Sequence, residues 1–177
     1  WIEQLNIIQF AFGLYFSGKL LADNLKSIPA KKSMIKGSYF LFAMLILAVI
    51  FTADPLENTK FDLSLLTLNG FLHFMLVGFF VIVSPYGIVK LARIFKSEPG
   101  YKNLASVTLF MGLSTFAACV IWFAFFFGGF LLEYRGIFEK IIALWVLIWI
   151  VLINLRSVKN YNLGKKDKES LKFSNEV

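Results

Sequence analysis

Charged side chains are scarce in this chain, and so are the residues on which most enzyme and metal sites depend. Only 16% of the 177 residues are charged and 58% are hydrophobic, whereas roughly a quarter of a soluble domain is charged. One cysteine, Cys119, excludes an internal disulfide, and one histidine, His73, excludes a haem held by two axial histidines. The sequence has no nucleophile motif, phosphate-binding loop or full metal-ligand set, so it predicts no cofactor and no metal.

Long apolar stretches take the place of these features, and they are rich in the chain's 21 phenylalanines. A helix needs roughly 20 mostly apolar residues to cross a bilayer. The chain therefore predicts an all-α, polytopic transmembrane helix bundle with spans at about residues 5–21, 37–53, 68–89, 104–131 and 137–155. Residues 158–177 are polar and mixed in charge, so we expect a cytoplasmic tail that is frayed or disordered.

The polar connections between these spans alternate in charge. Residues 19–36 hold five lysines and one aspartate, and residues 90–102 hold four basic residues and one glutamate. Residues 54–62 hold three acidic residues and one lysine. Because cytoplasmic loops are enriched in Lys and Arg, both basic connections and the C-terminus are predicted to be cytoplasmic, in a bacterial inner membrane. The net charge of +7 then reflects topology and not nucleic-acid binding.

This topology places Trp1 on the outer side of the membrane, opposite the cytoplasm. An uncleaved bacterial membrane protein commonly begins inside. The pattern therefore predicts either one further helix upstream, giving six in all, or a cleaved signal peptide. The sequence leaves both alternatives open.

Ionisable residues gather at the predicted outer ends of three spans. Asp54 ends the second span, His73 lies about one turn inside the third, and Glu139 and Lys140 open the fifth. Ionisable groups inside spans suggest a functional site, and similar depths allow Asp54, His73 and Glu139 to form one polar cluster. The alternative is structural: Asp54 ends a helix, His73 hydrogen-bonds a neighbour, and Glu139 and Lys140 are interfacial charges.

Two predicted helices carry a face of small or polar residues, of the kind that permits close helix packing. In the first span the spacing puts four such residues on one face, which we expect to point at other helices: Asn6, Gln9, Gly13 and Ser17. The fourth span carries a ridge predicted to be a packing seam: Ala105, Thr108, Gly112, Thr115 and Cys119. Pro85 is expected to kink the third span.

Several short motifs occur in an order that is similar to one membrane family. The motifs are Phe51-Thr52-Ala53-Asp54-Pro55 at the end of one span, His73 in the next, Gly136-Ile137-Phe138-Glu139-Lys140 at the start of the last span, and Trp149 within it. They resemble the bacterial six-helix family known as domain of unknown function 998. The resemblance implies matching positions at Asp54, His73, Glu139 and Trp149, and a helix upstream. Thr52 stands where the family has Pro, and Lys140 where it has Arg.

These observations predict a non-catalytic accessory or structural subunit of a membrane complex, in contact with the lipid bilayer and with other membrane-protein subunits. The alternative is a lipid-modifying enzyme or a small-solute carrier with an outer-side site. A cavity lined by Asp54, His73 and Glu139 would favour the alternative. A bundle with a partner-binding face would favour the subunit.

Overall fold

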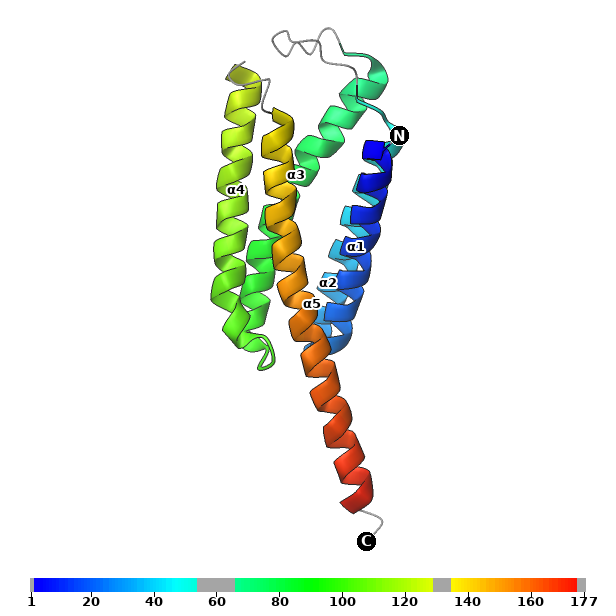
Figure 1. The fold of residues 1–177 in the computed structure, drawn as a ribbon, viewed down its shortest axis with the longest axis vertical. Helices are drawn as coiled ribbons and strands as arrows, with labels where there is room; N and C mark the ends of the chain where they lie inside the picture. Colours follow the sequence, from blue (N-terminus) through cyan, green and yellow to red (C-terminus); the bar gives the residue numbers. More distant parts are fainter. Residues whose placement is uncertain (1, 54–65, 129–134, 175–177) are drawn as a thin grey trace.

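The fold, given by a computed structural model, is a bundle of long helices (Figure 1). The structure describes residues 2–53, 66–128 and 135–174, and in these ranges it is all-helical without a β-strand. The helices are α1 (Ile2–Asn24), α2 (Ile28–Ile50), α3 (Leu68–Ser97), the short 3-10 helix η2 (Lys102–Leu104), α4 (Ala105–Gly128) and α5 (Arg135–Ser174). All five α-helices are long and apolar enough to cross a membrane. The predicted all-α transmembrane bundle is thereby confirmed.

Several helix limits differ from those that hydropathy predicted; α3, for example, ends at Ser97 and not at residue 89. Helix α2 begins at Ile28 and not at residue 37. Pro29 fits the first turn of a helix, where no N–H is needed, and the Ser27 side chain accepts a hydrogen bond from the Ala30 N–H. Helix α5 continues to Ser174, so the expected fraying after residue 158 is wrong. That segment has no proline, and its lysines and leucines are good helix formers.

The helices pack as two pairs with α5 against both. Helices α1 and α2 form one pair, α3 and α4 form the other, and α5 contacts α4 and α1. In Figure 1 the first half of α3 leans away from α4, whereas its second half runs beside α4. Helix α3 is continuous through Pro85.

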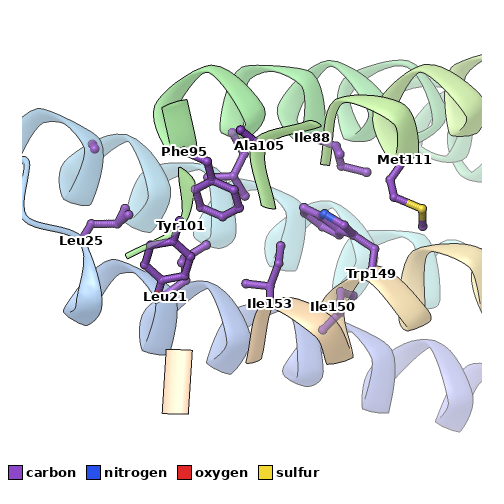
Figure 2. Packing of buried hydrophobic residues seen from close by; sticks show 12 residues of the cluster. Leu21, Leu25, Ile88, Phe95, Tyr101, Ala105, Met111, Trp149, Ile150 and Ile153 are labelled. Atoms are coloured by element: carbon purple, nitrogen blue, oxygen red, sulfur yellow. The ribbon is translucent and has the colours of Figure 1, made fainter. Parts of the chain in front are cut away.

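The apolar core lies in one half of the bundle (Figure 2). It occupies the end where α1 turns into α2 and α3 turns into α4. Phe95 and Tyr101 stack there with ring centroids 4.9 Å apart, and the Trp149 indole points from α5 toward Ile88 and Met111. The other members of this cluster are Leu21, Leu25, Ala30, Leu91, Ala105, Ile150 and Ile153.

The predicted packing seam of α4 is confirmed. All five of its residues, Ala105, Thr108, Gly112, Thr115 and Cys119, are buried. A Cβ added at Gly112 would lie 2.8 Å from Cγ2 of Val89 and 3.0 Å from its backbone N. Helices α3 and α4 therefore approach closely because position 112 has no side chain.

Three of the four residues on the predicted packing face of α1, Asn6, Gln9 and Gly13, are exposed in this chain. The fourth, Ser17, accepts a hydrogen bond of 2.8 Å from Asn154 Nδ2 of α5. The buried side of α1 carries Ala11, Gly18, Leu21 and Ala22, and the buried Leu25 follows directly after the helix. The reason is steric: an added Cβ at Gly18 would collide with the Ser38 side chain of α2, so this is where α1 and α2 come together.

Candidate functional site

The predicted outer-side cluster falls largely outside the described residues. Asp54 is not among them, and neither is the side chain of Glu139. Lys140 is exposed on α5. The structure therefore neither joins nor separates Asp54, His73 and Glu139, and their cluster stays a prediction. In the described ranges, no three His, Cys, Asp or Glu side chains are grouped as metal ligands.

His73 binds the C-terminal end of α2. Its Nδ1 lies 2.9 Å from the Ala48 carbonyl oxygen and 2.7 Å from the Phe51 carbonyl oxygen. Carbonyl oxygens only accept hydrogen bonds, so Nδ1 carries the proton and donates. The last carbonyls of a helix have no partner within the helix. His73 therefore connects α3 to the end of α2, as the structural alternative predicted.

A second polar side chain, that of Glu98, binds the opposite end of α2. Its side chain is only 3% exposed. Oε2 accepts a hydrogen bond of 2.9 Å from the Lys26 N–H, and Oε1 accepts one of 2.9 Å from the Ser27 N–H. Helix α2 has no acidic residue in its first turn. Glu98 therefore supplies the negative charge that the N-terminus of a helix favours.

The turn that carries Glu98 also holds α5. Arg156 Nε donates to the Gly100 carbonyl at 2.7 Å, and Asn160 Nδ2 donates to the same oxygen at 3.1 Å. The Tyr101 hydroxyl lies 2.8 Å from Oγ of Ser157. Burial raises the pKa of Tyr101 above its usual 10, although hydrogen bonds from Ser157 and Asn160 and the Arg156 charge act against this. The phenol is thus neutral near pH 7.

We call this end of the molecule the basic end: the turn of residues 25–27, the turn of residues 98–101, and α5 from Arg156 to Asn160. The hydrogen bonds of Glu98 and Gly100 join all three segments. The two basic connections and the start of the tail therefore lie at one end of the bundle, as the charge pattern predicted. In the sequence, Glu98 counted only toward the charge of residues 90–102, and its role in joining the helices was not predicted. The run Glu98-Pro99-Gly100 signals a turn, but nothing local reveals the partners of the carboxylate.

Two tryptophans attach α5 to α4 within the spans. Trp145 Nε1 donates to Ser114 Oγ at 2.9 Å, and Trp149 Nε1 donates to Thr108 Oγ1 at 3.3 Å. Such interhelical bonds satisfy polar groups that lipid cannot. Trp149, a residue of the family-like pattern, thus has a packing role in this structure.

A cavity of about 450 Å³ lies between the five helices. Its size is within the range of small-molecule pockets. The wall is mostly apolar, and every helix contributes, with Phe10, Met34, Phe80, Leu91, Trp122 and Trp149 among the lining residues. The few polar lining groups include Ser33, Ser84 and Lys90. His73 does not line this cavity, so the space differs from the predicted outer-side site.

No family model matches the chain, and no curated protein or solved structure matches it either. The resemblance to the six-helix family therefore stays a prediction that rests on its motifs.

Proposed function

We propose that this chain is a non-catalytic accessory or structural subunit of a membrane complex, and that α1 contacts a transmembrane helix of another subunit. The observation that carries the proposal is the exposure of Asn6, Gln9 and Gly13 on α1. We call these three residues the polar face of α1. It lies on the side of the helix away from the buried Ala11, Gly18 and Ala22.

The physical argument concerns what surrounds this face in a bilayer. Hydrocarbon offers no hydrogen-bond partner to an amide side chain, and burying such a group without a partner is costly. The side chains of Asn6 and Gln9 make no hydrogen bond with the described part of the chain. A Cβ at Gly13 would meet nothing within 4 Å. Small residues and amides are the residues that membrane helices use to approach one another, so the polar face of α1 suits a partner helix.

The ionisable side chains described above are consistent with a structural role. The Nδ1 of His73 donates a hydrogen bond at the end of α2, and the carboxylate of Glu98 accepts hydrogen bonds at its start. Both groups connect helices. The enzyme or carrier alternative depends on Asp54 and on the side chain of Glu139, which lie outside the described residues.

Photocrosslinking in native membranes tests the subunit proposal, because it needs no reactive group on the partner. A benzophenone amino acid in place of Gly13 should give one discrete product on irradiation, and Gln9→Leu should weaken that product without lowering thermal stability. The same benzophenone amino acid in place of Phe110 on α4, also exposed, is the control and should give none. The mass of the product separates a second copy from another protein. Absence of a product at Gly13, or an equal product at Phe110, would refute the proposal.

We also propose that the basic end faces the cytoplasm of a bacterial inner membrane. The support is the Lys and Arg enrichment of cytoplasmic loops. A membrane-impermeant maleimide added from outside should label Glu57→Cys but not Lys32→Cys or Lys96→Cys. Labelling of the two lysine positions alone would reverse the orientation.

A further inference from the structure

The cavity between the helices has a mouth in the half nearer the basic end. Four of its lining residues are exposed there: Gly37 on α2, and Tyr86, Gly87 and Lys90 on α3. A Cβ added at Gly37 or Gly87 would meet nothing within 4 Å. Both glycines line the cavity, and no neighbouring atom would obstruct a side chain added at either position. Because both helices are transmembrane by length and composition, this mouth opens sideways toward lipid.

Lys90 gives the mouth a positive charge. Among the described residues, no carboxylate forms an ion pair with Lys90. Arg93 follows one turn later on α3, and Lys36 precedes Gly37 on α2. Ser33 adds a hydroxyl to the lining from the facing helix. The mouth thus offers positive charge and a hydroxyl group, while the interior beyond it is apolar.

We propose that this cavity holds one acyl chain of an anionic phospholipid whose phosphate lies at Lys90. The apolar wall reaches from Met34 and Leu91 to Trp122 deeper in the bundle, which fits a chain and not a polar solute. A volume of about 450 Å³ has room for one long chain, so the second chain stays in the bilayer. Basic residues near a membrane surface attract anionic headgroups. This proposal does not depend on the polar face of α1.

Native mass spectrometry of the purified full chain in detergent tests the proposal. Phosphatidylglycerol and phosphatidylcholine with identical acyl chains serve as the probes. The wild-type protein should retain one phosphatidylglycerol about fivefold more tightly than phosphatidylcholine, the ratio that one lysine near a headgroup supplies. Lys90→Gln should abolish that preference. Equal retention of the two lipids by the wild type would overturn the proposal, and so would copurification of a free fatty acid in place of the phospholipid.

The glycines at the mouth allow a direct block of the cavity. Gly87→Leu and Gly37→Leu each place a side chain in open space, so either should remove lipid binding while the bundle stays folded. Ala117→Leu, at an exposed position on α4 that does not line the cavity, is the matched control and should bind lipid like the wild type. If both blocking variants fold and retain the lipid, the proposal is wrong.

A measurement on the unmodified protein keeps the proposal testable if both blocking variants fail to fold. Trp122 and Trp149 line the cavity. Phosphatidylglycerol with brominated chains should therefore quench tryptophan fluorescence more than brominated phosphatidylcholine at the same mole fraction. Equal quenching by the two lipids would overturn the proposal.

Discussion

The two halves of the bundle are built differently. In the half at the basic end, one turn joins the helices through the buried carboxylate of Glu98, the carbonyl of Gly100 and the ring of Tyr101, above a continuous apolar core. In the opposite half, α3 leans away from α4 (Figure 1), and His73 ties α3 to the end of α2. The cavity begins where the compact core gives way to this more open region.

This contrast indicates where the structure is fixed and where it can accept a ligand. Polar groups that are fully satisfied and buried hold helices in one arrangement. A cavity needs the opposite, a region with fewer side chains between helices, and here Gly37 and Gly87 line the space without adding side chains to it. Ile88, Leu91 and Trp149 belong both to the core and to the cavity wall, so the compact half anchors the helices directly beside the cavity.

Glu98→Gln should have the largest effect, because it removes the charge that binds two N–H groups at the start of α2. An amide offers one oxygen, so one buried donor is left facing an NH₂ group. We expect a loss of about 3 kcal/mol in the free energy of unfolding, measured by denaturant titration in mixed micelles. Asp23→Asn, which changes an exposed carboxylate at the same end, is the control. Equal stability of the two variants would contradict the role given to Glu98.

Gly112→Leu should have the next largest effect, because it forces α3 and α4 apart. The added Cβ would lie 3.0 Å from the backbone N of Val89, which cannot rotate away. Overpacking of this kind costs about 1–3 kcal/mol. Thermal unfolding in detergent measures it, with Ala117→Leu, at an exposed position on the same helix, as the control. A midpoint like that of the wild type would show that the seam tolerates a larger side chain.

His73→Ala tests the only described polar link between α2 and α3 in the open half. It should cost about 1–2 kcal/mol, since the carbonyls of Ala48 and Phe51 lose a common donor. Asn69→Ala, an exposed change on the same helix, should be neutral in the same unfolding titration. If His73→Ala is as stable as Asn69→Ala, the histidine is not a structural link, and a role in an outer-side site gains weight.

The sequence predicted the parts of this fold that depend on periodicity and composition. Helix number and the buried ridge at Gly112 follow from hydropathy and from spacings of three and four residues. The partners of Glu98 were out of reach because Lys26 and Ser27 are about seventy residues away in the chain. The spacing on α1 predicted a helix-packing face, but it could not say whether the facing helix belongs to this chain or to a partner. The cavity was not foreseen, since it is an absence of side chains between five separate segments.

Tyr101→Phe should have the smallest effect on stability. The pH dependence of this effect tests whether the buried phenol is its cause. The change removes the hydrogen bond with Ser157 but keeps the ring stacked on Phe95, so we expect a loss of about 1 kcal/mol at pH 7.

The pKa of Tyr101 is raised by burial in the folded state, so the folded protein keeps its phenolic proton at a pH where the unfolded chain, with a pKa near 10, has lost it. The contribution of the phenol is complete below pH 10 and falls as the pH rises through the folded value. The stability difference between wild type and Tyr101→Phe should therefore shrink above pH 10. The exposed Tyr86→Phe is the control, and a constant difference for Tyr101→Phe across this range would show that the buried phenol does not govern it.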